Sequence, residues 1–489
     1  MTLASPRFGL LQGYNSGKYH CELLGSSSQP HPVIELIERQ LSTISESELR
    51  TRAAAAENDL FDLGVTFTVY SEKSVIDRVF PFDLIPRVLT AAEWSTIEAG
   101  VIQRVAAINL FLADIYGPQH VLKDGVVPSE LVFGNPNFRR EMQGVNVSNG
   151  TYVAICGVDI VRDEYGRFLV LEDNARTPSG VSYVLENRRM MLRAWPELFD
   201  GLPVRSVDSY GSRLRQAMTE LSPPAAADPH IVLLTPGAYN SAYFEHVFLA
   251  REMGVTLVEG RDLIVIDKRV FMRTIAGLRR VDTIYRRIDD DFLDPLVFRK
   301  DSILGVPGLM EAYVSGNVEL ANAVGTGVAD DKAVYANMPR LIRYYLGQDA
   351  ILPNVDTHLC AEADGLAFTL ENLDTLVVKP VGASGGYGVM IGPRATKAEI
   401  EETRAKIVED PCNFISQPVV GLSVCPTLCA DGIEPRHVDL RPFAVTGRNT
   451  WVLPGGLTRV ALKKNSLVVN SSQGGGSKDT WVLFPEAPR

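Results

Sequence analysis

Residues 158–180 read VDIVRDEYGRFLVLEDNARTPSG, and the interpretation of the whole chain starts from this stretch. β-Branched and apolar residues flank the turn sequence RDEYG, which predicts a β-hairpin. Side chains two residues apart on a strand share a face, so Glu172 and Asn174 point one way and Asp173 points the other. The hairpin is expected to bring Asp159 back beside Glu172 and Asn174.

Asp159, Glu172 and Asn174 would form a cluster of hard oxygen ligands. Two carboxylates and an amide oxygen suit Mg²⁺, which completes its coordination with waters and substrate phosphates. Arg176 follows directly and is placed to hold a developing anion. A solvated, charged hairpin edge is the alternative interpretation of the same residues.

A second stretch, TLVVKPVGASGGYG at residues 375–388, predicts a strand that ends at Lys379 and a glycine-rich loop. Glycine permits close backbone approach, so successive N–H groups can converge on phosphate oxygens while a lysine adds charge. The pattern is neither a Walker A motif nor a dinucleotide fingerprint. It predicts a phosphate-binding loop or, alternatively, a flexible hairpin tip; the loop residues concerned are Gly382, Ser384, Gly385, Gly386 and Gly388.

Arginines follow on two later strands. HVDLRPFAVTG at 437–447 carries Arg441, and TRVAL carries Arg459. Because the guanidinium offers a bidentate fork to phosphate, both are candidate phosphate clamps, with surface ion pairing as the alternative. The tail VVNSSQGGGSKD at 468–479 adds Asn470 and three glycines, which fit a second phosphate-facing loop or a plain turn.

Composition excludes several classes of protein. The 489 residues are 46% hydrophobic and 22% charged, which is ordinary for a globular protein, and the net charge of −11 offers no basic surface for nucleic acid. We find no run of about 18 apolar residues and no signal peptide, so we expect a cytoplasmic protein with no membrane partner. The six cysteines have no CxxC pair and predict reduced thiols without a zinc site.

The order of elements predicts an α/β fold. Residues 33–57 and 92–116 have the apolar spacing of amphipathic helices, and SPPAAADP at 222–229 is the clearest boundary. From IVLLTPG at 231, strands and helices alternate, as in a parallel sheet, and strands dominate from residue 375. We therefore expect three units: a helical region with the metal hairpin, an α/β substrate domain, and nucleotide-binding lobes, at residues 1–222, 230–335 and 336–489.

Together these motifs resemble the ATP-grasp superfamily. In its D-alanine:D-alanine ligases, a hairpin with Asp on one strand and Glu-x-Asn on the next holds two Mg²⁺ ions, as VDIVRDEYGRFLVLEDN would here. The superfamily also has two ATP lysines, and the resemblance assigns them to Lys332 in DDKAVY and to Lys379. The adenine-reading hinge would lie in FISQPVV, at Gln417, Pro418 and Val419.

The order of the motifs resembles a circular permutation. Ribosomal-protein glutamate ligases show a DxR strand, a later Arg, then Asn and glycines, and only afterwards the metal hairpin. Here DLR, Arg459, Asn470 and GGG follow that order, but the hairpin lies far upstream. The chain is similar to the bacterial circularly permuted ATP-grasp family, type 2, and to glutathionylspermidine synthetase-like proteins, from about residue 60 to 484. The resemblance implies an ATP-grasp fold in permuted order, with a pre-ATP-grasp α/β domain and N-terminal helices.

The resemblance implies a carboxylate–amine ligase that uses ATP and two Mg²⁺ ions and forms an acylphosphate. Lys332 and Lys379 would grip the nucleotide phosphates, and Arg176, Arg441 and Arg459 would face the acylphosphate. A peptide, amino acid or polyamine-like substrate would enter the α/β domain at Asn240, Arg286, Arg287 and Asp289, although a salt-bridged loop is the alternative there. A small-molecule phosphotransferase and a non-catalytic ATP-binding protein remain rival functions, and no oligomeric state is predicted.

Overall fold

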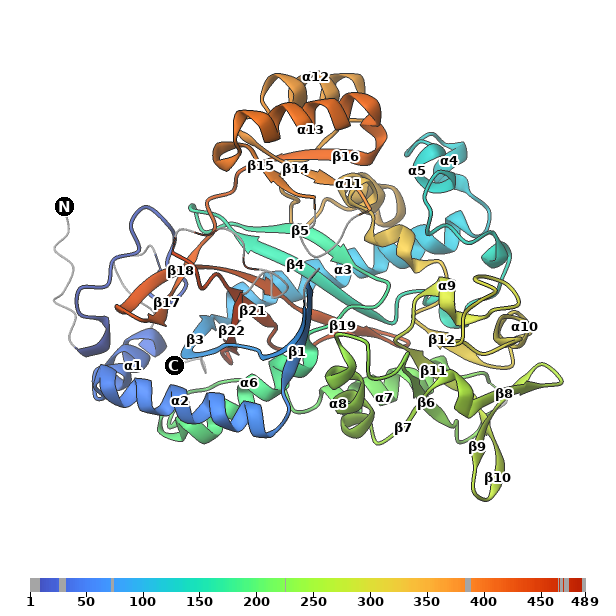
Figure 1. Ribbon diagram of the computed structural model, residues 1–489, viewed down its shortest axis with the longest axis horizontal. Coiled ribbons are helices and arrows are strands. Elements are labelled where there is room, and N and C mark those ends of the chain that lie inside the picture. The colour runs from blue at the N-terminus through green and yellow to red at the C-terminus, as the bar shows by residue number, and fades with distance from the viewer. Residues whose placement is uncertain are drawn as a thin grey trace.

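A computed structural model describes residues 9–25, 32–71, 74–224, 226–382, 388–464, 466, 469 and 475–485. Its centre is a large mixed sheet with the strand order β20-β19-β4-β18-β21-β22-β3, to which β5 is added on β4 and β17 on β18 (Figure 1). These strands are β3 (Phe82–Leu89), β4 (Ile155–Arg162), β5 (Phe168–Asn174), β17 (Val424–Cys429), β18 (Gly432–Arg441), β19 (Phe443–Thr446), β20 (Thr450–Val452), β21 (Leu457–Val460) and β22 (Gly476–Val482). The hairpin β4–β5 therefore pairs with strands from the end of the chain, as the permuted order requires.

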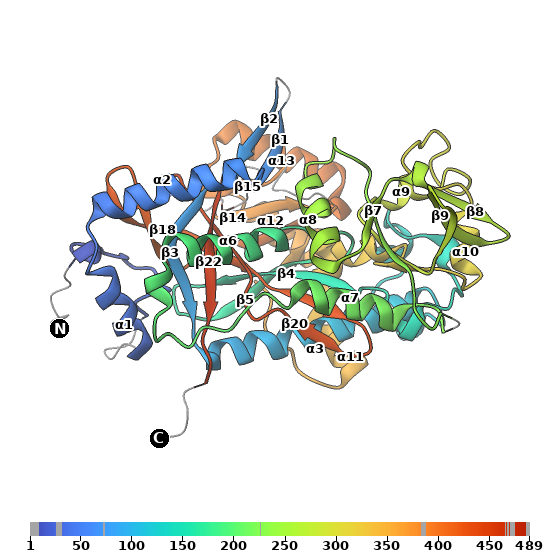
Figure 2. The ribbon, with the colours of Figure 1, turned by 90° about the horizontal axis from the view of Figure 1, so that it is seen from below.

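Helices cover both faces of this sheet. Alternate residues of β4 enter two different cores: Cys156 and Val158 pack with α3 (Ala91–Ile115), whereas Ile155 packs with α6 (Val181–Ala194). Figure 2 shows α6 lying across β22 and β3. Edge strand β3 contains Pro86, which suits an edge because proline cannot donate to the ladder. The sheet consequently presents a different set of side chains to each helical layer.

Helix α3 begins with a capping box between Thr90 and Glu93. In the described residues it is the one helix that is long and apolar enough to cross a membrane by length and composition, a test that a buried core helix also passes. Trp94, Ile108 and Phe111 of α3 are fully buried in the main core. Its apolar composition is thus used in packing.

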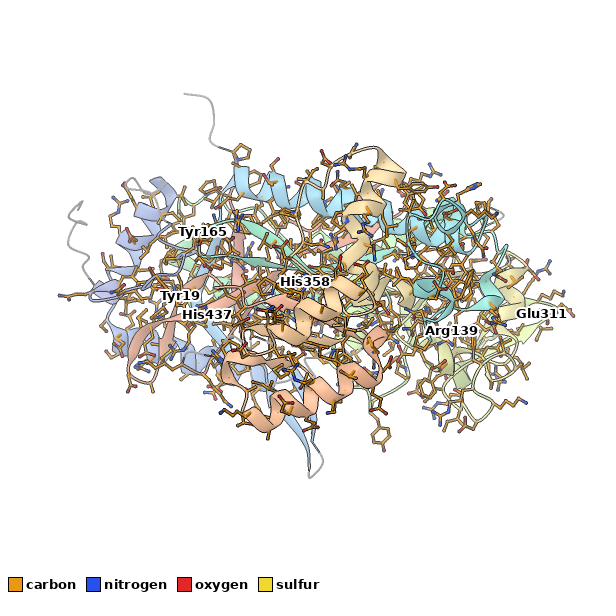
Figure 3. All side chains as sticks on the ribbon, turned by 90° about the horizontal axis from the view of Figure 1, so that it is seen from above. Tyr19, Arg139, Tyr165, Glu311, His358 and His437 are labelled. Carbon is orange, nitrogen blue, oxygen red and sulfur yellow. The ribbon has the colours of Figure 1, made fainter. Side chains whose placement is uncertain are left out.

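The N-terminal part of the chain wraps one end of the large sheet. The predicted helix over 33–57 is two helices, α1 (Pro32–Leu41) and α2 (Glu46–Asp62), because the Ser45 side chain accepts from the Glu48 backbone N–H and starts a new helix. Tyr19 packs edge-on against His437 of β18, with ring centroids 4.6 Å apart (Figure 3). Other short elements in the first 133 residues are β1 (Thr66–Ser71), β2 (Ser74–Val79), α4 (His120–Lys123) and α5 (Glu130–Phe133).

The α/β unit contains a parallel sheet, as the alternating pattern predicted. Its strand order is β12-β11-β6-β7, from β6 (Ile231–Leu234), β7 (Thr256–Val258), β11 (Thr283–Arg286) and β12 (Glu319–Ala321). Helices α7 (Tyr210–Leu221), α8 (Tyr243–Met253), α9 (Asp290–Leu293) and α10 (Leu309–Val314) accompany it. A protruding antiparallel sheet was not predicted in full: β8 (Leu263–Ile266), β9 (Arg269–Thr274) and β10 (Gly277–Val281). The predicted boundary at 222–229 lies between α7 and β6.

A small lobe stands above the large sheet (Figure 1). Its strand order is β13-β16-β14-β15, from β13 (His358–Leu359), β14 (Leu376–Pro380), β15 (Met390–Ile391) and β16 (Phe414–Pro418). Helices α12 (Ala363–Glu371) and α13 (Lys397–Glu409) cover its outer side, and α11 (Lys332–Leu346) runs beneath it. The prediction of strands alone missed α12 and α13, although Thr396 and Glu399 form a capping box at the start of α13.

Candidate functional site

The hairpin β4–β5 brings two carboxylates together. Its register sets Asp159 opposite Glu172 and Gly157 opposite Asn174, so these side chains share one face of the hairpin as expected. Asp159 is 1% exposed, whereas the Glu172 side chain keeps 30% of its surface exposed. Burial, together with the negative charge of Asp159, raises the pKa of Glu172. The hairpin thus concentrates negative charge at a partly open position.

Two arginines from the end of the chain neutralise Asp159. Arg441 donates to both of its carboxylate oxygens, and Arg459 Nη2 donates to Oδ2 at 2.7 Å. Burial alone would raise the pKa of Asp159, but the charges of Arg441 and Arg459 hold it well below its usual range. The same Nη2 of Arg459 also donates to Asp439 Oδ2, at 2.5 Å. The two predicted phosphate clamps therefore lie at the hairpin and are held by carboxylates.

Gly157 allows Arg441 to lie across β4. A Cβ atom at this position would stand 3.2 Å from Arg441 Cδ and 3.3 Å from Pro178 Cβ, closer than side chains usually pack. We expect Gly157→Ala to lower the free energy of unfolding by about 1–2 kcal/mol, measured by urea denaturation, because overpacking displaces both neighbours. Gly382→Ala is the control, since its added methyl group would meet no atom of the described residues within 4 Å. Equal stability of the two variants would contradict this packing argument.

The two predicted ATP lysines face the hairpin from the small lobe and α11. Lys379 on β14 donates to Gln417 Oε1 at 2.7 Å, and Lys332, the first residue of α11, donates to the Val381 carbonyl at 3.5 Å. The pKa of Lys379 is lowered to about 8, mainly by burial; the charges of Glu172 and Asp159 oppose this shift and the charge of Lys332 adds to it. The charges of Lys379 and Glu172 therefore interact across the space between the small lobe and the hairpin.

The other predicted nucleotide residues lie around this space or outside the described residues. Pro418 ends β16 and is exposed, and Val419 follows it and is half-buried. Gly382 and Gly388 flank the glycine-rich loop, and Gly388 has a positive φ of 71°. Ser384, Gly385, Gly386 and Asn470 lie outside the described residues.

Asp330 is a site residue that the sequence interpretation missed. Arg176 lies between two carboxylates, with Nη1 3.4 Å from Asp289 Oδ1 and Nε 3.5 Å from Asp330 Oδ2. Burial raises the pKa of Asp330 to about 6, and the negative charge of Glu172 adds to the rise. The motif DDK could have indicated Asp330, which lies two residues before Lys332. The sequence interpretation used only the lysine of this motif.

A cavity of about 280 Å³ opens beside Arg176 in the α/β unit. Polar residues of its wall are Thr177, Ser179, Asn240, Ser241, His246, Arg287 and Asp289. Three of the four predicted substrate residues thus line one space. Arg286 does not: it is 1% exposed and donates to the carbonyl oxygens of Asn322, Ile288 and Ala323. Arg286 instead ties β11 to the chain after β12.

The donor atoms of the hairpin suit a magnesium ion. In the described part of the chain, no group of three or more His, Cys, Asp or Glu side chains is arranged to hold a metal ion. Glu172, Asn174 and Asp159 supply two carboxylates and an amide, which is enough for Mg²⁺ when phosphates and waters complete its shell. Burial and then the nearby charge of Asp159 raise the pKa of Glu172, and a bound cation would oppose both effects. The donor set therefore fits Mg²⁺. Arginine side chains contact Asp159 more closely than Glu172 or Asn174.

Comparisons with known proteins bear on the family and the fold of the chain. The sequence profile of circularly permuted ATP-grasp type 2 proteins matches residues 86–461. A protein of Synechocystis is 52% identical over 97% of this chain and 98% of its own length, and one of Mycobacterium tuberculosis H37Rv is 52% identical over 92% and 81%. A protein of Frankia casuarinae, provisionally named glutamate–cysteine ligase 2-2, is 41% identical over 97% of this chain but only 54% of its own length.

One solved structure is similar over most of the chain. It is the glutathione synthetase-like effector of Globodera pallida in its apo form, with a TM-score of 0.56 at 10% identity, covering 90% of this chain and 98% of the effector. At that identity the likeness concerns the fold alone.

Proposed function

Because the chain belongs to the circularly permuted ATP-grasp type 2 family, we propose that it is an ATP-dependent ligase that joins a carboxylate to an amine. One observation carries the proposal: the carboxylates of the hairpin, Lys379 of the small lobe and Lys332 of α11 converge on one space. The charges of Glu172 and Asp159 act on Lys379 across it. This arrangement suits a nucleotide whose phosphates bridge the two parts of the molecule.

The proposed reaction has two steps. An oxygen of the substrate carboxylate attacks the γ-phosphorus of ATP, the bond to the β-phosphate oxygen breaks, and ADP leaves with that electron pair. The amine nitrogen then attacks the acyl carbon of the acylphosphate and expels phosphate, which gives an amide after the nitrogen loses a proton. Phosphorylation is needed because a carboxylate is a poor electrophile, and the protein contributes mainly position and charge.

Individual residues have separate tasks in this proposal. Lys332 and Lys379 hold the nucleotide phosphates, and Arg176, Arg441 and Arg459 stabilise negative charge around the transferred phosphoryl group. Glu172 and Asn174, with Asp159, would hold Mg²⁺, which supplies charge neutralisation for the phosphates. Gln417 keeps Lys379 in place through its 2.7 Å hydrogen bond and is itself anchored on Thr357 at 2.9 Å.

The name of the Frankia relative supports a carbon–nitrogen ligase, although this chain matches only about half of that protein. We propose an amino acid, a peptide or a polyamine-like compound as the substrate class. The test is a coupled assay of ADP release over a panel of amino acids, dipeptides and polyamines, with mass spectrometry of the products. Amine-dependent ADP release with an amide product supports the ligase. A stable phosphorylated product without amine dependence would identify a phosphotransferase instead.

Nucleotide affinity should depend on pH through Lys379. Its pKa of about 8 in the free protein lies below that of an ordinary lysine, and bound phosphates favour the charged form and raise it. Binding between about pH 8 and pH 10 should therefore take up a proton, and the affinity for a non-hydrolysable ATP analogue should fall by up to about tenfold per pH unit. Isothermal titration in buffers of different ionisation enthalpy measures both quantities.

Two variants control the pH experiment. Lys379→Met should bind weakly and lose the proton uptake, while Lys406→Met, which removes an exposed lysine paired with Glu402, should keep both the affinity and its pH dependence. A pH dependence that persists in Lys379→Met would assign the titration to another group.

A further inference from the structure

The loop of Thr177, Pro178 and Ser179 lies between the arginines at the hairpin, Arg441 and Arg459, and the cavity of the α/β unit. On one side, Arg441 Nη1 donates to the Ser179 carbonyl oxygen at 3.2 Å. On the other side, Arg287 Nη1 donates to the Pro178 carbonyl oxygen at 2.6 Å. The cavity therefore lies one loop away from the place where the proposed acylphosphate would form.

The cationic group of the cavity wall is already neutralised. Arg287 pairs with Glu245 at 3.1 Å, and both side chains are almost fully buried. Glu245 also accepts from the backbone N–H groups of Gly180 and Ser182, which fixes the loop at the start of α6. Burial, helped by the charge of Arg287, lowers the pKa of His246 to about 2, so this histidine of the wall stays neutral.

The anionic group of the wall is only partly neutralised. Asp289 keeps 49% of its side chain exposed, and its one ionic partner within the described residues, Arg176, is shared with Asp330. One guanidinium therefore faces two carboxylates. With Arg287 and Glu245 balanced, the cavity and its border carry an excess of negative charge.

We propose that this cavity binds the amine substrate and selects a small molecule whose ammonium group pairs with Asp289. This inference rests on the proposed ligase function and adds the chemical class of the second substrate. The hydroxyl groups of Thr177, Ser179 and Ser241 and the amide of Asn240 offer hydrogen bonds to a neutral polar remainder. The volume of about 280 Å³ lies below the usual range for drug-sized ligands, which points to an amino acid or a short amine.

A thiol reporter tests the charge preference without ATP. Ser241→Cys is made in a background in which the exposed Cys412 and the half-buried Cys429 are replaced by serine. The rate of modification is measured with aminoethyl methanethiosulfonate, a cation, and with sulfonatoethyl methanethiosulfonate, an anion. In each reaction the thiolate forms a disulfide and methanesulfinate leaves. Both rates are divided by those of a free thiol, so that intrinsic reactivity cancels.

We expect the corrected ratio of cation to anion to be about tenfold or more, and Asp289→Asn to lower it several-fold. Asp291→Asn is the matched control: it removes the same charge two residues further along the chain, in α9, but Asp291 is 59% exposed and pairs with Arg139. A ratio near one, or an equal drop in Asp291→Asn, would overturn the proposal. If Ser241→Cys does not fold, Thr177→Cys replaces it as the reporter.

The ligase assay separates this inference from the function itself. With an accepted amine, Asp289→Asn should raise the KM for the amine about tenfold, while binding of the ATP analogue stays unchanged. Absence of any amine-dependent ADP release would refute the ligase, whereas the thiol assay would still report the charge preference. An unchanged KM for the amine in Asp289→Asn would refute the role of Asp289 and leave the ligase standing.

Discussion

Glu172→Gln is expected to lower amine-dependent ADP release by about a hundredfold to a thousandfold. The substitution keeps the size of the side chain but removes the charge that faces Lys379 and the proposed metal. It should leave the free energy of unfolding within about 1 kcal/mol, because the Glu172 carboxylate is partly exposed and crowded by Asp159. ADP release and urea denaturation of the same preparation measure the two effects.

The matched control is Glu164→Gln, in the exposed turn of the same hairpin. It removes one negative charge from the same element, so it should leave activity and stability unchanged. If both variants lost activity to the same extent, net charge and not position would explain the effect. Wild-type activity in Glu172→Gln would remove the hairpin from the proposed mechanism.

In contrast to Glu172→Gln, Asp173→Ala should act mainly on stability. We expect it to lower the free energy of unfolding by about 3–5 kcal/mol. Asp173 is buried on the other face of β5, where it accepts two hydrogen bonds from Arg104 of α3 at 2.6 and 2.8 Å. The Arg104 side chain is 1% exposed, so the substitution leaves a buried charge with only the Asn354 amide oxygen as a polar partner among the described side chains. Urea denaturation followed by circular dichroism measures the loss.

The double variant Arg104→Leu, Asp173→Ala tests the cause of that loss. Removing both members of a buried ion pair is far less costly than removing one, so the double variant should recover part of the stability. A double variant less stable than Asp173→Ala would show that the cavity left by the side chains, and not the unpaired charge, dominates.

The opposite faces of Glu172 and Asp173 could be predicted from the sequence because strand alternation is a local rule. The same rule separates Arg286, the last residue of β11, from Arg287, which follows it, but the sequence interpretation placed both in the substrate site. In the structure, Arg287 reaches the cavity and Arg286 turns into the core. Adjacent charged residues on a strand should therefore be divided between its faces before a site is assigned.

The family and the permuted fold could be predicted because several short motifs occur in the order that a circular permutation produces. Both predictions are confirmed. What could not be predicted depends on contacts between distant segments. The pairing of Asp159 with Arg441 and Arg459, the position of Asp330 beside Arg176 and the cavity itself arise only when the segments pack. Helices α12 and α13 were missed because their short apolar patterns stand between strongly marked strands.

Strand β4 lies inside the large sheet, with β5 on one side and β18 and β19 on the other. Asp159 and Arg441 are 282 residues apart, so translation at about 5–20 residues per second separates their emergence from the ribosome by roughly 15–60 s. During that interval the nascent hairpin has unpaired strand edges and an uncompensated acidic group. Chaperones that shield unpaired strands should therefore engage this protein at the hairpin, after the hairpin emerges and before Arg441 does.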